Sequence, residues 1–232
     1  MSKLAERIIE EAARRGDPTR RDDLLRYFKE PIETYGLSQT QNKELAQLFY
    51  PEVKGDLPAA LALTEELLAT GNMDVASVGL KILDRFRSKL GAEHFPLFDK
   101  WVEYLNNWAT TDHFTAHHIS ECIRDNPQLI EQLITWTGSE NRWRRRASAV
   151  TLVTIARKGM MLEEALRLAD QLMMDEDDMV QKGVGWVLKE ASRHHPYEIH
   201  EYLQRWKPKS PALILRYASE KLPEELRVLK TR

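Results

Sequence analysis

Apolar residues recur along nearly the whole chain at the spacing of an α-helix. Leu4, Ile8 and Ile9 begin this pattern, which becomes regular from Leu57 onward, with glycine and proline at most of the breaks. Alternation with period two does not extend over a useful length, so we expect no strands. From residue 57 onward the pattern predicts helices at 58–70, 74–90, 96–106, 110–124, 127–137, 142–158, 163–173, 179–194, 196–206 and 211–221.

The predicted helices form pairs that recur about every 35 residues, which is typical of stacked helical repeats. The segments ASVGLKILDRF, RASAVTLVTIA and QKGVGWVLKEA each read as a second helix, and Trp101 and Trp136 occupy similar places on two first helices. Such pairs bury their apolar faces only by stacking into a curved solenoid. We therefore expect one all-α domain over 1–232, a HEAT-like helical-repeat solenoid with a concave groove, comprising a cap at 1–55, repeats at 56–222 and a tail at 223–232.

The composition is that of a folded globular protein. Of 232 residues, 42% are hydrophobic and 30% are charged, which excludes a disordered chain. The single cysteine, Cys122, excludes an intrachain disulfide and suits a reducing compartment. The amphipathic N-terminus carries acids, unlike a secretory signal, and no apolar run is long enough to span a membrane. We expect a cytoplasmic monomer.

The net charge of −2 does not favour a nucleic-acid partner, but the charges are unevenly distributed. Residues 141–158 contain six cations and no acid, whereas residues 163–178 contain seven acids and the single cation Arg167. This distribution predicts a basic wall and a separate acidic wall. A charge run is usually only a solvated face, so the basic wall alone is weak evidence for nucleic acid.

The stretch from Asn106 to His113 contains the most informative pair of residues. On a helix, Trp108 and Asp112 lie one turn apart and project from the same face. One interpretation is a tryptophan packed between repeats and an aspartate that caps a helix. The other is a carboxylate beside an aromatic wall, which could stabilise the positive charge that develops on a sugar during glycosidic cleavage.

A second candidate stretch contains Arg142, Arg144, Arg145 and Arg146 around Trp143. These cations could form a solvated helix start or a clamp for phosphate oxygens, which guanidinium groups match well. Cations in the first turn oppose the helix dipole and therefore need a partner.

A third stretch, residues 181–186, places two glycines inside an otherwise apolar helix, at a cost of about 1 kcal/mol each relative to alanine. Gly183 and Gly185 indicate either close packing between helices or the close approach of a ligand backbone beside Trp186. Lys182 adds a cation, and Tyr27 is a further groove candidate. Equivalent positions of a solenoid line up, so we expect Asp112, Arg146 and residues 182–186 to face one groove.

Other chemistry has weaker support. His113, His117 and Glu121 have the spacing of zinc ligands on a helix, but neither an HExxH motif nor a set of cysteines accompanies them. Solvated or partly buried histidines are the favoured interpretation, and we expect no metal. There is no P-loop, GxGxxG or GxSxG motif, so we expect no nucleotide cofactor.

Taken together, NNWATTD, SENRWRRRASAV, VQKGVGWVLKEAS and LRYASEKLP resemble the DNA alkylation repair family of AlkD-type glycosylases. The resemblance extends from about Tyr27 to Leu222. It implies a HEAT-like fold that acts in base excision repair on double-stranded DNA. The substrates would be positively charged N-alkylated purines such as 3-methyladenine and 7-methylguanine, excised without a metal or cofactor.

The resemblance also implies individual roles. Asp112 resembles the catalytic carboxylate, and Trp108 and Trp186 resemble the tryptophans that cradle the sugar of the damaged nucleotide. Arg146 matches an arginine that contacts the DNA backbone, and Tyr27 matches a tyrosine of the same cleft. We further expect DNA contacts from Arg142, Arg144, Arg145, Trp143 and Lys182.

One departure from the family concerns the turn after the cap. Arginines often follow this turn in the family, but here Gly36 is followed by LSQTQNK, which removes positive charge from a possible DNA contact. The alternative to an enzyme is a non-catalytic repeat protein that binds distorted or branched DNA, or a scaffold that binds other proteins.

Overall fold

A computed structural model describes residues 1–229 of the chain, and within that range every helix or strand assigned is a helix. An isolated parallel β-bridge joins Glu33 and Asn72. The predicted all-α fold is therefore confirmed. Within the same residues, no helix combines the length and the apolar character needed to cross a membrane.

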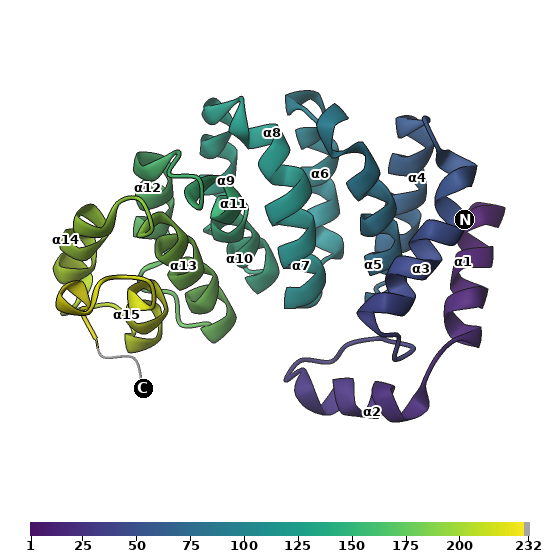
Figure 1. Ribbon diagram of the computed structural model, residues 1–232, viewed down its shortest axis with the longest axis horizontal. Coiled ribbons are helices and arrows are strands. Elements are labelled where there is room, and N and C mark those ends of the chain that lie inside the picture. Colours follow the sequence, from purple (N-terminus) through teal and green to yellow (C-terminus); the bar gives the residue numbers. More distant parts are fainter. Residues whose placement is uncertain (230–232) are drawn as a thin grey trace. The chain divides into compact units, whose positions relative to one another are not determined.

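The chain forms two compact units. Their helices are labelled in Figure 1. The first contains Met1–Leu90 and Pro96–Phe114, and the second contains Gly91–Phe95 and the chain from Thr115 onward. Helices of the first unit are α1 (Lys3–Arg14), α2 (Pro18–Tyr27), α3 (Gln39–Phe49), α4 (Leu57–Leu68), α5 (Met73–Leu83), α6 (Phe95–Trp101) and α7 (Trp108–Phe114). Short 3-10 helices cover Tyr50–Val53, Asp84–Lys89 and Val102–Tyr104, and a further one, Ala92–His94, belongs to the second unit.

The second unit is likewise helical. It contains α8 (Ser120–Arg124), α9 (Ile130–Trp136), α10 (Arg142–Val150), α11 (Val153–Ala156), α12 (Leu162–Leu172), α13 (Asp178–Ala191), α14 (Pro196–Trp206) and α15 (Ala212–Ser219). A π-helical turn covers Thr115–Ile119, and 3-10 helices cover Pro127–Leu129 and Glu224–Leu226. Helix α13 packs against α10, α11, α12 and α15, so it is the central helix of this unit.

Large aromatic side chains fill the core of each unit. Trp101 is fully buried in the first unit, where it packs with Phe98 and Phe114 at ring-centroid distances of 5.2 and 5.8 Å. Trp136 is buried in the second unit and stacks on Phe95 at 5.6 Å. The two tryptophans at similar places of the predicted repeats are therefore core residues. As large aromatic side chains, they bury much apolar surface.

Several predicted helices are shorter or interrupted in the structure. The helix predicted over 142–158 breaks between Val150 and Val153, where the Thr151 hydroxyl donates to the Ala147 carbonyl at 2.8 Å. The helix predicted over 74–90 ends at Leu83 and continues as a 3-10 helix. Threonine and serine hydroxyls that bond to a carbonyl four residues earlier often bend helices. The spacing of apolar residues in the sequence does not indicate where such hydrogen bonds form.

The π-helical turn also replaces part of a predicted α-helix, the one over 110–124. Within it, the Ala116 carbonyl accepts hydrogen bonds from the Ser120 hydroxyl at 2.7 Å and from the Thr154 hydroxyl at 3.0 Å. Extra donors of this kind compete with the regular ladder of backbone hydrogen bonds, and π turns occur where the ladder is disturbed.

The loop between α2 and α3 is anchored by a buried carboxylate at the start of α5. Asp74 Oδ2 accepts from the Thr34 hydroxyl at 2.7 Å and from the backbone amides of Tyr35, Gly36 and Leu37 at 2.8, 3.1 and 3.3 Å. Gly36 has φ +85°, and a Cβ there would lie 2.3 Å from the Asp17 carbonyl oxygen, so the turn requires glycine. The same loop thus packs against the start of α2, where the Asp17 amide donates to the Tyr35 carbonyl at 2.9 Å.

The residues that follow Gly36 begin the next helix. Ser38 caps α3, since its hydroxyl accepts from the Gln41 amide at 3.1 Å while the Gln41 side chain accepts from the Ser38 amide at 2.8 Å. This reciprocal capping box stabilises the first turn of α3.

Candidate functional site

Asn107 determines where the helix of the candidate carboxylate begins. Its side-chain oxygen accepts from the Thr110 amide at 3.0 Å, and its carbonyl accepts from the Thr111 hydroxyl at 2.7 Å. Helix α7 therefore starts at Trp108, and Asp112 is its fifth residue rather than its cap. Asp112 lies one turn after Trp108 and is partly exposed.

Trp108 forms an aromatic cluster with the end of α2. Its ring is stacked on Phe28, with centroids 5.3 Å apart and planes inclined by 15°. Tyr27 approaches Trp108 edge-on at 6.4 Å. Phe28, Ile32 and Met73 form the buried base of this cluster, whereas Tyr27 is 69% exposed. The structure thus brings together two of the predicted site residues, Tyr27 and Trp108.

Phe28 is absent from the predicted site, although it supports both aromatic residues. The signal that could have identified it is its place beside Tyr27 in the sequence RYFK. Its position depends on the α2–α3 loop, because Met73 donates its backbone amide to the Glu33 carbonyl at 2.8 Å while its side chain packs in the cluster. The start of α5 therefore holds the cluster through both backbone and side-chain contacts.

Two of the residues considered as zinc ligands, His113 and Glu121, contact charged side chains. His113 Nε2 lies 3.0 Å from Asp84 Oδ2, at the end of α5. Glu121 forms an ion pair with Arg124 in α8. The contact between His113 and Asp84 fixes one side of α7, the helix that carries Asp112.

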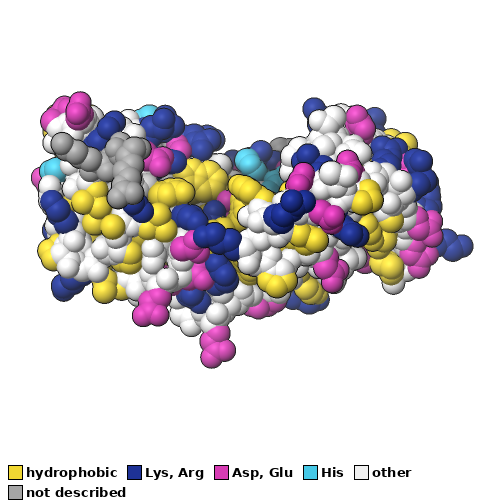
Figure 2. Space-filling view, turned by 90° about the horizontal axis from the view of Figure 1, so that it is seen from below, with side chains coloured by type: hydrophobic (Ala, Val, Ile, Leu, Met, Phe, Trp, Pro, Cys, Tyr) yellow, Lys and Arg dark blue, Asp and Glu magenta, His cyan; other side chains and the backbone are white. Residues whose placement is uncertain are grey.

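The arginine stretch lies at the start of α10 and is paired with the acids before and within the first turn of α13. Arg142 Nε lies 2.9 Å from Asp177, and Arg145 Nε lies 2.7 Å from Asp175. Lys182 lies 2.9 Å from Asp178. The prediction of a basic wall separate from an acidic wall is therefore wrong for these residues. Basic and acidic side chains are also intermixed on the face drawn in Figure 2.

The remaining members of this stretch are packed against the protein. Arg144 lies over the Trp136 ring, 5.1 Å from its centroid. Trp143 is only 6% exposed and packs beneath the Arg142 guanidinium. Arg146 is 5% exposed and donates from Nη1 to the Met179 carbonyl. The partners that first-turn cations need are thus supplied within the chain itself.

The two glycines of α13 are explained by close helix packing. A Cβ on Gly185 would lie 2.4 Å from Tyr217 Cβ in α15, and one on Gly183 would lie 3.3 Å from Arg146 Cγ and Val150 Cγ2 in α10. Of the two interpretations of these glycines, the structure supports the contact between helices. Trp186 and Lys182 lie one turn apart on α13, and both are partly exposed.

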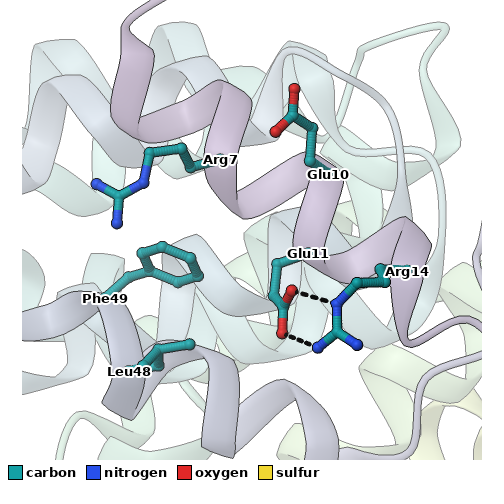
Figure 3. Close-up of a pocket in the computed structure, with 6 residues that line it drawn as sticks. All are labelled: Arg7, Glu10, Glu11, Arg14, Leu48 and Phe49. Atoms are coloured by element: carbon teal, nitrogen blue, oxygen red, sulfur yellow. Dashed lines mark hydrogen bonds and ion pairs between the residues drawn. The ribbon is translucent and has the colours of Figure 1, made fainter.

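A surface hollow of about 440 Å³ lies between α1 and α3 (Figure 3). Arg7 lies over the Phe49 ring at 5.4 Å, and Glu11 binds Arg14 at 2.6 Å. Hydrogen bonds from Arg14 and Arg15 hold the pKa of Glu11 at about 2. The hollow is lined by Arg7, Glu10, Glu11, Arg14, Leu48 and Phe49, a set that includes no predicted site residue.

Comparison with known proteins identifies a family for this chain. The family model described as DNA alkylation repair enzyme matches residues 8–222. No curated protein sequence matched the chain.

Solved structures show the same fold at low sequence identity. A predicted DNA alkylation repair enzyme from Enterococcus faecalis has a TM-score of 0.77 and 16% identity, covering 90% of this chain and 97% of that chain. The protein smu.31 from Streptococcus mutans UA159 has a TM-score of 0.60 and 16% identity, covering 95% and 100%. AlkD2 from Streptococcus mutans has a TM-score of 0.59 and 18% identity, covering 80% and 91%.

Proposed function

Because this chain belongs to the DNA alkylation repair enzyme family, we propose that it is a monofunctional DNA glycosylase that removes positively charged N-alkylated purines from duplex DNA. The observation that carries this proposal is the arrangement of α7. Trp108 stacks on Phe28 and meets the exposed Tyr27, and Asp112 follows one turn later on the same helix. An aromatic surface beside a carboxylate suits a sugar that gains positive charge.

The chemistry needs few groups from the protein. An alkylated purine already carries a positive charge, so the electron pair of the breaking N-glycosidic bond neutralises the base as it leaves. Water then adds to the anomeric carbon of the sugar and releases a proton. In this mechanism Asp112, as a carboxylate, stabilises the oxocarbenium-like sugar and orients the water.

The aromatic residues contact the substrate through their faces. Tyr27 and Trp108 present ring surface to a nucleotide, and the partly exposed Trp186 offers another indole on α13. Stacking and cation–π contacts favour a nucleotide that bears positive charge over an undamaged one. The partly exposed Arg142, Arg144, Arg145 and Lys182 are the cations proposed to contact phosphate oxygens.

Base release from methylated duplex DNA tests the proposal. We expect the wild-type protein to release methylated purines, and Asp112→Asn to lower the rate by at least roughly 100-fold while still binding DNA. Asp125→Asn is the matched control, since this exposed carboxylate pairs with Arg124 outside α7. Equal release by wild type and Asp112→Asn would remove Asp112 from the mechanism.

A second candidate function is favoured by the ion pairs of α10. Because Arg142, Arg145 and Lys182 are paired with aspartates, the chain has less free positive charge for DNA than the sequence predicts. This pairing suits a non-catalytic repeat protein that binds distorted DNA or another protein. DNA binding without base release would support the DNA-binding form, and the absence of both would support a protein scaffold.

A further inference from the structure

A buried carboxylate joins two arginines at the carboxyl ends of α11 and α13. Glu190 has only 4% of its side chain exposed, and its Oε2 accepts from Arg157 Nε at 2.9 Å and from Arg193 Nε at 2.7 Å. Arg157 directly follows α11 and Arg193 lies two residues after the end of α13, and the two arginines are 36 positions apart in the sequence. One carboxylate oxygen thus fixes two guanidinium groups side by side.

The two guanidinium groups are bound to the protein at one nitrogen each. Among residues 1–229, their hydrogen bonds are made only through Nε, and the Arg157 and Arg193 side chains are 50% and 42% exposed. A guanidinium has five N–H donors in a fixed fork, so its terminal nitrogens remain to bind an anion. Because Nε is held, little side-chain freedom would be lost on binding.

The surrounding backbone holds the same region together. His194 Nε2 lies 3.1 Å from the Arg157 carbonyl oxygen, and His195 Nε2 lies 3.0 Å from that of Gly159. Since carbonyl oxygens only accept, each Nε2 carries its proton. Gly159 has φ +75°, and a Cβ there would lie 2.9 Å from His194, so the turn after α11 fits closely against the end of α13. Glu198 lies 3.8 Å from His195.

The balance of charge differs from that of the predicted DNA-binding arginines. Arg142 and Arg145 each have an aspartate of their own. Here Arg157 and Arg193 share one carboxylate, and the exposed Lys158 follows Arg157 in the sequence. A cation at the carboxyl end of a helix complements the helix dipole, and this structural role is sufficient to explain one of the two arginines. A buried carboxylate also needs one ionic partner, so the second guanidinium is the unexplained group.

We propose that Arg157 and Arg193, oriented by Glu190, form a phosphate-binding site for the backbone of duplex DNA. Glu190 follows Lys182 by eight residues, so this site lies about 12 Å along α13 from that predicted contact. The site rests on the proposed function in that DNA is the substrate. It adds a contact outside the cations of α10 and increases affinity for DNA without regard to sequence or damage.

The test is the salt dependence of binding to an undamaged duplex. We expect Arg157→Gln and Arg193→Gln each to weaken binding roughly three- to tenfold at low salt. Each should also reduce the steepness of the plot of log affinity against log salt by about 0.9 for a lost phosphate contact. Each single variant leaves Glu190 one arginine partner. If either unfolds, the variant that also carries Glu190→Gln removes the buried charge and keeps the test available.

Arg167→Gln and Arg205→Gln are matched controls, because both are exposed arginines of the second unit on α12 and α14. If the Arg157 and Arg193 variants bind DNA as these controls do, the proposal is overturned. Inorganic phosphate, titrated by calorimetry, separates the two sources of the ligand. Loss of phosphate binding in the variants with unchanged DNA binding would overturn the assignment to DNA.

The result of the salt-dependence test does not depend on whether the protein is a glycosylase. If the wild-type protein binds DNA but releases no methylated base, the proposed glycosylase fails while the salt-dependence test still stands. If base release occurs and the variants keep the wild-type salt dependence, this site fails while the glycosylase stands.

Discussion

The indole ring of Trp108 lies nearly parallel to the ring of Phe28, with centroids 5.3 Å apart and an interplanar angle of 15°. Phe28 is buried at the end of α2, while its neighbour Tyr27 is exposed. Phe28 therefore supports the predicted site residue Trp108. It also lies at the beginning of the loop that is anchored to Asp74, a residue 46 positions after Phe28 in the sequence. Support of this kind reduces the freedom of side chains that contact a substrate.

Phe28→Ala should impair both stability and base release. Removing a buried phenylalanine costs about 3 kcal/mol, and Trp108 would lose the ring on which it stacks. Under the proposed function, we expect kcat/KM for methylated DNA to fall by roughly tenfold or more. Phe28→Leu retains most of the apolar volume and should cost about 1 kcal/mol. Chemical unfolding and base-release assays of both variants would measure these effects.

Asp74→Ala should destabilise the first unit strongly. The substitution leaves the amides of Tyr35 and Leu37 and the Thr34 hydroxyl without their buried acceptor, which we expect to cost about 3–5 kcal/mol in total. The comparison variant is Asp56→Ala, which removes the bond that the Asp56 side chain accepts from the Ala59 amide at 3.0 Å and should cost about 1 kcal/mol. Equal losses in urea unfolding would contradict the anchoring role of Asp74.

The two glycines of α13 should respond differently to alanine. Gly185→Ala places a Cβ 2.4 Å from Tyr217 Cβ and should destabilise the protein by more than about 2 kcal/mol. Gly183→Ala places its Cβ 3.3 Å from side-chain atoms that can shift, and a gain in helix propensity of about 1 kcal/mol offsets the crowding. Thermal unfolding of the pair measures this difference, and similar midpoints would refute it.

Glu190 should make stability depend on acid pH. Burial alone would raise the pKa of Glu190, but hydrogen bonds from Arg157 and Arg193 outweigh it and hold the pKa below its ordinary value of 4.5. The unfolded chain then binds this proton more readily than the folded chain. The stabilisation is therefore complete above about pH 4.5 and is lost as the pH falls through the lower folded-state pKa.

Thermal unfolding of wild type and Glu190→Gln between pH 7 and pH 3 measures this dependence. We expect the wild type to be the more stable protein at pH 7 and the difference to shrink as the pH falls below 4.5. A difference that stays constant over this range would show that Glu190 does not carry the effect.

The helical fold could be predicted because burial of one face imposes a period that is visible in the sequence. The helix over Pro196–Trp206 has the predicted bounds. The breaks at Thr151 and in the π turn at Thr115–Ile119 could not be predicted, since they accompany hydroxyl groups that bond to carbonyls. These bonds depend on local geometry rather than on apolar spacing.

The candidate site could be predicted only in part. Trp108 and Asp112 share a helix, which their spacing indicates, and Tyr27 meets Trp108 in the structure. The pairing of Arg145 with Asp175 was not predictable, because the two residues are 30 positions apart and a count of charges carries no distances. Phe28 was missed because a buried aromatic residue looks like any other core residue in a sequence.

Arg142 and Arg145 of α10 are paired with aspartates that lie just before α13, so the binding of a phosphate requires an exchange of partners. A phosphate that binds the terminal nitrogens of Arg145 must compete with Asp175 for the same guanidinium. Affinity at that arginine is then the difference between two ionic contacts, and salt weakens both of them. Such an exchange contributes little to the affinity for DNA of any sequence. Discrimination between damaged and intact nucleotides therefore depends mainly on groups that are not paired with another side chain of the protein.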